Sequence, residues 1–193
     1  MYCKQLVTHN TYRYYFSAGY SLVELLAVLT IASILLSMAV PSMTGMINTQ
    51  RSTSLGNSFL AGLNLARNEA IKRNARTVLC KSADGLSCTS SGGWQQGWIL
   101  FHDVNNNARL DAGEQVIQLQ GGVSQGLSLT GNTNVANYVS YSASGSAKLI
   151  SGAFQAGTFR LCLDPVVVAD VRQIILSSTG RARSKKGLES DCF

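Results

Sequence analysis

The sequence predicts an α+β protein in which a long N-terminal helix packs against antiparallel β-structure. Two observations support this prediction. Helical patterns of apolar residues fill the first part of the chain, and after Asn74 the pattern changes to short strands separated by Gly, Ser and Asn. Because helix and strands follow one another instead of alternating, an antiparallel sheet is favoured over a parallel one. The length of 193 residues suggests one globular domain in addition to the first apolar segment.

The beginning of the chain predicts a leader followed by a membrane helix. Residues 1–19 contain Lys4 and Arg13 and no acidic residue, as expected for a short basic segment in the cytoplasm. Residues 20–41 are mostly apolar, with Glu24 as their one charged residue, and they predict a transmembrane helix. A carboxylate in such a helix costs about 2.5 to 3.5 kcal/mol, so we expect Glu24 to have a cationic partner. The alternative is a plain signal anchor whose acid reaches the membrane surface.

Residues 42–76 predict an amphipathic helix. Apolar residues recur at three- and four-residue steps and form a face that a sheet should cover; they are Leu55, Phe59, Leu63, Ala66 and Ala70. The other side carries one acid, Glu69, and the basic residues Arg51, Arg67, Lys72, Arg73 and Arg76. We interpret this basic side as a solvated helix face and not as a ligand surface.

Residues 77–193 predict a β-rich domain with a basic C-terminal segment. The candidate strands are short runs bounded by turn-forming residues: 77–81, 97–102, 115–119, 127–130, 138–142, 158–163 and 171–177. Trp94 and Trp98 lie at the start of the second run. Aromatic residues of this size are expected in a core more often than on a binding surface.

The cysteines predict two disulfides in an exported domain. Cys3 lies in the leader, which leaves the even set Cys80, Cys88, Cys162 and Cys192. Four cysteines permit three pairings, and closure of short loops favours Cys80–Cys88 and Cys162–Cys192. A zinc site is disfavoured because there is no C-x-x-C pair and the two histidines lack a ligand spacing.

Residues 103–114 raise the possibility of a calcium loop. Oxygen-bearing side chains stand at the spacings of an EF-hand loop, at Asp103, Asn105, Asn107, Asp111 and Glu114. However, Ala108 replaces the glycine that makes the sharp turn, and the flanks are predicted strands instead of helices. Since Asn and Asp also stabilise hairpin turns, we expect a structural turn and no bound metal.

The basic C-terminal segment is the main candidate for binding a ligand. After Gly180 it holds four cations, Arg181, Arg183, Lys185 and Lys186. If the segment is extended, Arg181 and Arg183 lie on one side, where they can contact successive phosphates of DNA. A Cys162–Cys192 disulfide would hold the segment as a closed loop against the domain. The alternative is a solvated tail that keeps the protein soluble.

The start of the apolar segment, G-Y-S-L-V-E-L-L at residues 19–26, resembles the processing site of type IV prepilins and type II secretion pseudopilins. The resemblance implies that prepilin peptidase cuts after Gly19 and that Tyr20 becomes the methylated N-terminal residue. It also implies that Glu24 meets the N-terminal amine of a neighbouring subunit in a filament. Pairing the two charges offsets the cost of placing each in lipid.

Residues 80–103 and 176–183 resemble the GspH/FimT branch of these proteins. The resemblance implies a pilin-like fold, with the long helix packed on antiparallel sheet, and a role as a minor pilin. It is greatest to FimT-type minor pilins, in which a G-R-x-R motif near the C-terminus serves DNA uptake. Gly180, Arg181 and Arg183 match that motif.

We therefore predict a minor type IV pilin that binds double-stranded DNA non-specifically for uptake in natural transformation. It would be anchored in the inner membrane with a periplasmic C-terminal domain, and would then join other pilins in a filament at the cell surface. A second hypothesis is a minor pseudopilin of type II secretion, or a pilus-priming subunit, with protein partners alone. A third is an adhesin-like module with an incidental anchor. No enzyme motif and no cofactor site is recognisable.

Overall fold

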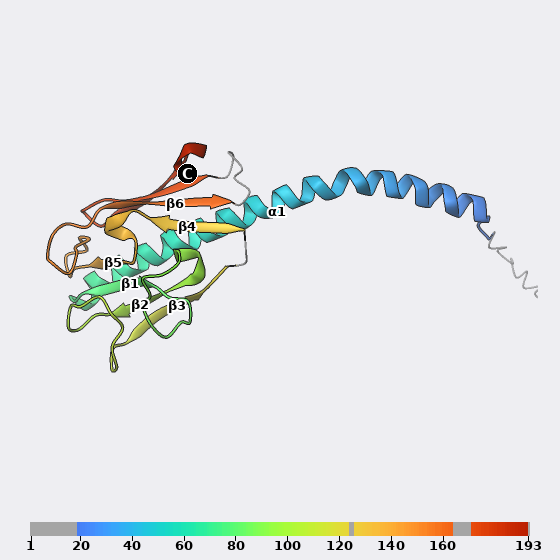
Figure 1. Ribbon diagram of the computed structural model, residues 1–193. Coiled ribbons are helices and arrows are strands. Elements are labelled where there is room, and N and C mark those ends of the chain that lie inside the picture. The colour runs from blue at the N-terminus through green and yellow to red at the C-terminus, as the bar shows by residue number, and fades with distance from the viewer. Residues whose placement is uncertain (1–18, 124–125, 164–170, 193) are drawn as a thin grey trace, which may run out of the picture. The chain divides into compact units, whose positions relative to one another are not determined.

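The structure is a computed structural model, and it describes residues 19–123, 126–163 and 171–192 (Figure 1). Two compact units divide the chain, Met1–Thr44 and Gly45–Phe193. The helix α1 spans Leu22–Arg73. The strands are β1 Thr77–Lys81, β2 Gly97–His102, β3 Val116–Gly121, β4 Leu127–Gly131, β5 Tyr138–Tyr141, β6 Gly157–Leu163, β7 Arg172–Leu176 and β8 Ala182–Lys186. Short 3-10 helices are η1 Trp94–Gln96, η2 Thr133–Val135 and η4 Glu189–Cys192.

The helix α1 ends at Arg73, whereas the sequence predicted that it would continue to residue 76. Asn74 adopts a left-handed backbone conformation, with φ of 50°. Its N–H donates to the carbonyl of Ile71, and the N–H of Ala75 donates to the carbonyl of Ala70. These two bonds form a Schellman motif, in which asparagine takes the position that glycine usually occupies. The motif stops the helix and turns the chain toward β1.

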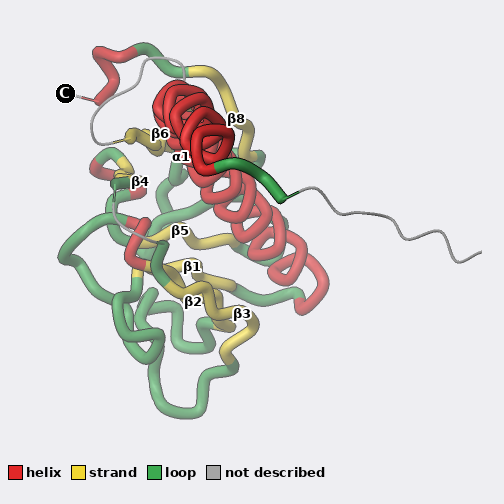
Figure 2. The backbone as a smooth tube through the Cα atoms, turned by 90° about the vertical axis from the view of Figure 1, so that its right-hand side faces the viewer, coloured by secondary structure: helices red, strands yellow, loops and turns green. Residues whose placement is uncertain are grey.

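The strands form two four-stranded antiparallel sheets, in the orders β3-β2-β1-β5 and β4-β6-β7-β8. The predicted antiparallel arrangement is therefore confirmed. Figure 2 shows the strands of the first sheet lying side by side along α1. β1 and β2 begin and end at the predicted residues, and other strands differ from the prediction by one or two residues at an end. β8 is a strand that the sequence did not predict.

The main core lies between α1 and the two sheets. The predicted apolar face of the helix is buried, and Phe59 and Leu63 are fully inaccessible. Phe59 is surrounded by the rings of Trp94, Trp98 and Phe159, with ring centroids 5.0, 5.2 and 4.7 Å away in edge-on geometry. Both tryptophans thus belong to the core, as predicted. Such aromatic pairs add about 0.5 to 1.5 kcal/mol each beyond the burial of apolar surface.

A second, smaller core covers the other face of the first sheet. It consists of Val78, Cys80, Ile99, Phe101 and Ala108. The strand residues of this cluster alternate with the residues that face α1, as expected for a sheet buried on both faces. Ala108 comes from the loop of residues 103–114, so that loop covers the sheet.

The first part of α1 contains the segment that the sequence predicts as a membrane helix. The span expected over residues 20–41 begins as helix at Leu22. However, no helix among the described residues is both long and apolar enough to cross a membrane.

Candidate nucleic-acid interface

The basic C-terminal segment forms the second strand of a hairpin, within the loop that the Cys162–Cys192 disulfide closes. β8 pairs antiparallel with β7, from Leu176 opposite Ala182 to Arg172 opposite Lys186. The connecting turn is closed by hydrogen bonds from the N–H of Gly180 to the carbonyl of Ser177 and from the N–H of Ser177 to the carbonyl of Arg181. The cations are therefore held on a sheet.

Gly180 is required at this turn for two reasons. Its φ of 82° is in the left-handed region. In addition, a Cβ atom at this position would lie 2.0 Å from the carbonyl oxygen of Gly145. That same carbonyl accepts a hydrogen bond of 3.1 Å from Nε of Arg67 on α1, and the N–H of Ala147 donates to the carbonyl of Ser178 at 3.2 Å. The hairpin turn is thus fixed to the 142–147 turn and, through it, to the helix.

The alternation of β8 places most of the basic side chains on the outer face of the second sheet. Ala182 packs against the main core, so the residues next to it in the strand face outward. Arg181 and Arg183 line one pocket of about 320 Å³ together with Ile175 and Ser177, which shows that they lie on the same side. Lys185 follows on this outer face. Lys186 is the next residue in the strand, so its side chain is on the opposite face from the other three cations.

Arg160 of β6 lies on the same outer face, although no pattern in the sequence pointed to it. Its neighbours Phe159 and Leu161 are fully buried, and Arg160 is exposed on the other side of the strand. The strand register places Arg160 opposite Gln173 of β7, and Gln173 opposite Lys185 of β8. This position depends on pairing between distant segments, so no local sequence signal could reveal it.

We call Arg160, Arg181, Arg183 and Lys185 the basic face. The four strands of this sheet contain no Asp or Glu. Within the described ranges, the only ion pairs link Glu69 to Lys72 and to Arg73, both on α1. The four side chains of the basic face are therefore available to an anionic ligand. Since no acid lies between them, their potentials add.

The C-terminal disulfide limits the basic face at one end. Cys162 is bonded to Cys192, which ties η4 to β6. Cys162 lies two residues after Arg160 in β6, so both side chains are on the outer face of the sheet. The disulfide therefore holds η4 over the end of this face, beyond Arg160. Cys80 and Cys88 form the second disulfide. Both bonds have the pairing that loop length favoured.

Several basic residues of α1 serve the fold, which corrects the interpretation of this side of the helix as simply solvated. Besides Arg67, Arg73 donates to Gln115 at 2.6 Å and to Glu69. Arg76, just beyond the helix, donates to Oγ of Ser140 at 3.1 Å. Partners so far away in the sequence could not be predicted from helical periodicity. These side chains join the helix to the first sheet and its loops.

The loop of residues 103–114 uses its oxygen atoms for hydrogen bonds within the loop. Asp103 accepts bonds from the N–H groups of Asn107 and Ala108, and Glu114 accepts from those of Val104 and Asp111. Side-chain amides of Asn105 and Asn107 donate to Asp111 and lower its pKa. In the part of the chain that the structure describes, no group of three His, Cys, Asp or Glu residues is arranged for a metal ion. The loop is built as a turn.

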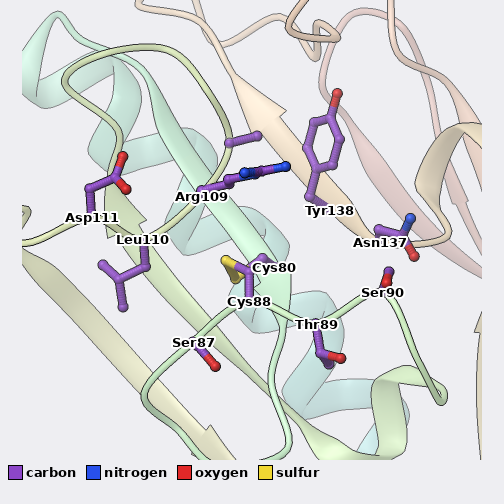
Figure 3. Close-up of a pocket in the computed structure, with 11 residues that line it drawn as sticks. Cys80, Ser87, Cys88, Thr89, Ser90, Arg109, Leu110, Asp111, Asn137 and Tyr138 are labelled. Atoms are coloured by element: carbon purple, nitrogen blue, oxygen red, sulfur yellow. A yellow bond between two sulfur atoms is a disulfide. The ribbon is translucent and has the colours of Figure 1, made fainter.

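A pocket of about 430 Å³ lies beside the Cys80–Cys88 disulfide (Figure 3). Its wall includes Arg109, Tyr138, Thr89, Ser90, and Ser87 from the loop that the disulfide closes. That loop is fixed by Asp84, which accepts hydrogen bonds from the N–H groups of Leu86 and Ser87 and from the hydroxyls of Ser87 and Ser82. These bonds hold the pKa of Asp84 well below its usual value. Because the two sulfur atoms are bonded to one another, the pocket offers no free thiol.

The predicted processing residues lie at the start of α1. Gly19 and Tyr20 precede the helix and are exposed. Oγ of Ser21 accepts a hydrogen bond of 3.2 Å from the N–H of Glu24, which is a helix N-cap. The Glu24 side chain is exposed. It forms no ion pair with any described residue of the same chain.

Comparisons with known proteins agree with this architecture. The type IV minor pilin FimU of Pseudomonas aeruginosa superposes with a TM-score of 0.51 at 18% identity, covering 69% of this chain and 91% of that structure. The minor pseudopilin EPSH of the Vibrio cholerae type II secretion system gives a TM-score of 0.50 at 11% identity, covering 72% and 99%. At these identities the likeness establishes the fold.

Sequence comparisons identify the family. The pilin-like protein PilA1 of Thermus thermophilus is 36% identical over 97 residues, which are 50% of this chain and 55% of that protein, so the chain spans about half the length of this relative. The prokaryotic N-terminal methylation motif matches residues 16–40. Pilins and pseudopilins are structural subunits, so the chain is not an enzyme. The family model of the type II transport protein GspH matches residues 55–180, most of the chain, which therefore belongs to the GspH family of minor pilins and pseudopilins.

Proposed function

We propose that this minor pilin or pseudopilin binds double-stranded DNA non-specifically through the basic face, as a subunit that captures DNA for uptake in natural transformation. The observation that carries the proposal is the arrangement of four unpaired cations on one open sheet face without an acid among them. The match of Gly180, Arg181 and Arg183 to the FimT-type motif supports the same ligand. The sequence predicted Lys186 as a further DNA-binding residue. Because its side chain is on the other side of the edge strand, we propose that it adds positive charge without belonging to the basic face.

The geometry suits a phosphate backbone. Arg181 directly precedes β8, and two residues of extended chain separate it from Arg183, and Arg183 from Lys185, by about 6.6 to 6.8 Å in each case. Successive phosphates of one DNA strand advance about 3.4 Å along the duplex axis, so the three side chains can each reach a different phosphate. Contacts from these cations to phosphates carry no sequence information. Binding should therefore not depend on sequence.

Salt dependence gives a quantitative expectation. If the four cations of the basic face each neutralise one phosphate, log K falls against log salt concentration with a slope of about −3.6. A fourfold rise in salt then weakens binding by about 150-fold. A much shallower slope would mean that fewer of these side chains contact DNA.

The test uses the unit Gly45–Phe193, which contains both cores and both disulfides and therefore should fold without the preceding segment. Fluorescence anisotropy with duplexes of unrelated sequence measures affinity. Replacing Arg181 and Arg183 together by Gln should lower affinity at least tenfold. The matched control replaces Arg51 and Arg109, which are exposed elsewhere, by Gln and removes the same net charge. Equal affinity of the two double variants would refute the proposal.

A pseudopilin with only protein partners is the second candidate. It is favoured by one specific observation: the GspH match ends at residue 180, before the cations of β8. This alternative predicts no DNA binding by the wild-type unit and stable complexes with the soluble domains of other pilins. Titration with DNA and with those domains separates the two functions.

We also propose that prepilin peptidase processes the chain in the inner membrane before it joins a filament with other pilins. The methylation-motif match supports cleavage after Gly19 and methylation of Tyr20. Glu24, which has no ion-pair partner in the described part of its own chain, would then meet the new N-terminal amine of a neighbouring subunit. Mass spectrometry of filament-associated protein should find N-methyltyrosine at residue 20. An intact leader would contradict this proposal.

A further inference from the structure

Arg160 stands apart from the other cations of the basic face in a way that matters for the shape of the ligand. Arg181, Arg183 and Lys185 follow one another along the edge of the sheet, whereas Arg160 lies two strands inward, on β6. Two interstrand steps of about 4.8 Å separate Arg160 from Lys185 by about 10 Å. The face is therefore two-dimensional, with one line of cations and one cation beside it.

We infer that Arg160 contacts the second strand of a bound DNA duplex while Arg181, Arg183 and Lys185 contact the first. This inference rests on the proposed function. A single nucleic-acid strand lying along β8 meets the edge cations alone. In a duplex, the minor groove of about 6 Å separates the two phosphate backbones, and the cations about 10 Å apart can contact the backbones on either side of it. The duplex form is the one that uses all four charges.

The surroundings of Arg160 favour a binding role over a structural one. The packing of β6 is provided by Phe159, Leu161 and Leu163, which point to the core. Arg160 points away from them, is exposed, and lies beside Thr130 and Gln173, which are neutral. Among the described residues no acid forms an ion pair with it. Its replacement should leave the fold unchanged, so a binding effect can be attributed to the lost contact.

The experiment compares Arg160→Gln with wild type in the unit Gly45–Phe193, on a duplex and on one of its separated strands. For the duplex we expect about tenfold weaker binding at low salt and a slope of log K against log salt that is shallower by about 0.9. Affinity for the single strand should change by less than about twofold. Arg160→Lys keeps the charge and should retain most of the duplex affinity, and a thermal melt checks the fold of each variant.

The outcomes separate the two proposals. Equal losses on duplex and single strand, or no loss on the duplex, would overturn the role of Arg160 and leave DNA binding by the edge cations intact. A wild-type unit that binds neither form would overturn both. A selective loss on the duplex, together with rescue by Arg160→Lys, supports the inference.

Discussion

Replacing Gly180 by alanine tests whether the hairpin turn depends on close contact with the neighbouring 142–147 turn. At φ of 82°, an alanine is strained by about 1 to 2 kcal/mol. Its Cβ would also lie 2.0 Å from the backbone carbonyl oxygen of Gly145, a distance that no real contact permits. Because that atom belongs to the backbone, the two turns must separate.

The magnitude follows from the bonds that such a separation disrupts. The Arg67 bond to the carbonyl of Gly145 and the bond from Ala147 to the carbonyl of Ser178 join the two turns, at 3.1 and 3.2 Å. Each is worth about 1 kcal/mol. Added to the backbone strain, their loss gives a destabilisation of about 3 to 4 kcal/mol for Gly180→Ala.

Gly152 provides the matched control. Its φ of 86° is nearly the same, but a Cβ there would meet nothing within 4 Å. Gly152→Ala should therefore cost the strain alone, about 1 to 2 kcal/mol. Urea unfolding of oxidised Gly45–Phe193 measures both changes. In thermal melts a loss of 1 kcal/mol lowers Tm by about 2 to 4 °C in a protein of this size, so Gly180→Ala should melt about 6 to 16 °C lower than wild type.

Equal losses of stability in Gly180→Ala and Gly152→Ala would refute this reasoning. The close approach of Gly180 to the carbonyl of Gly145 would then have no energetic role. If Gly180→Ala is destabilised as expected but keeps its full affinity for DNA, the turn supports the fold without positioning Arg181.

Two further predictions concern the disulfides and the acid stability of the domain. Replacing Cys162 and Cys192 by Ser should cost about 3.6 kcal/mol, and replacing Cys80 and Cys88 about 2.5 kcal/mol, because the sequence separations are 30 and 8 residues. Urea midpoints of the two variants check this order, and the reverse order would contradict it. The pKa of Asp84 is held below its ordinary 3.8, chiefly by the N–H of Leu86, so its contribution to stability is complete above that value and is lost as pH falls below it. Asp84→Asn should therefore flatten the decline of the urea midpoint below about pH 4, and an unchanged decline would rule out this source of acid sensitivity.

The sequence was sufficient to predict the elements whose own residues determine their structure. β1 and β2 consist almost entirely of buried residues bounded by turn-forming ones, and their limits were predicted correctly. The helix face that contains Phe59 was identifiable from its periodicity alone. In both cases the signal is local, because burial leaves a regular apolar pattern in the chain.

β8 shows why the rest was not predictable. In Ala-Arg-Ser-Lys-Lys only Ala182 packs against the core, so no apolar alternation marks the strand. The segment becomes a strand because β7 supplies the hydrogen-bonding partner and Gly180 closes the turn. The position of Arg160 beside this strand depends in turn on the register of β6 with β7. Interactions between segments of this kind leave no trace in either segment alone.

The place of β8 at the border of its sheet gives its charges another consequence. A border strand exposes unsatisfied backbone groups that can recruit strands from other molecules, and lysine or arginine side chains discourage such recruitment through mutual repulsion. The same residues that attract an anion thus keep neighbouring copies from pairing edge to edge through β8. Polyanions that mask these charges should promote clustering of the domain, and variants stripped of them should be harder to keep monodisperse.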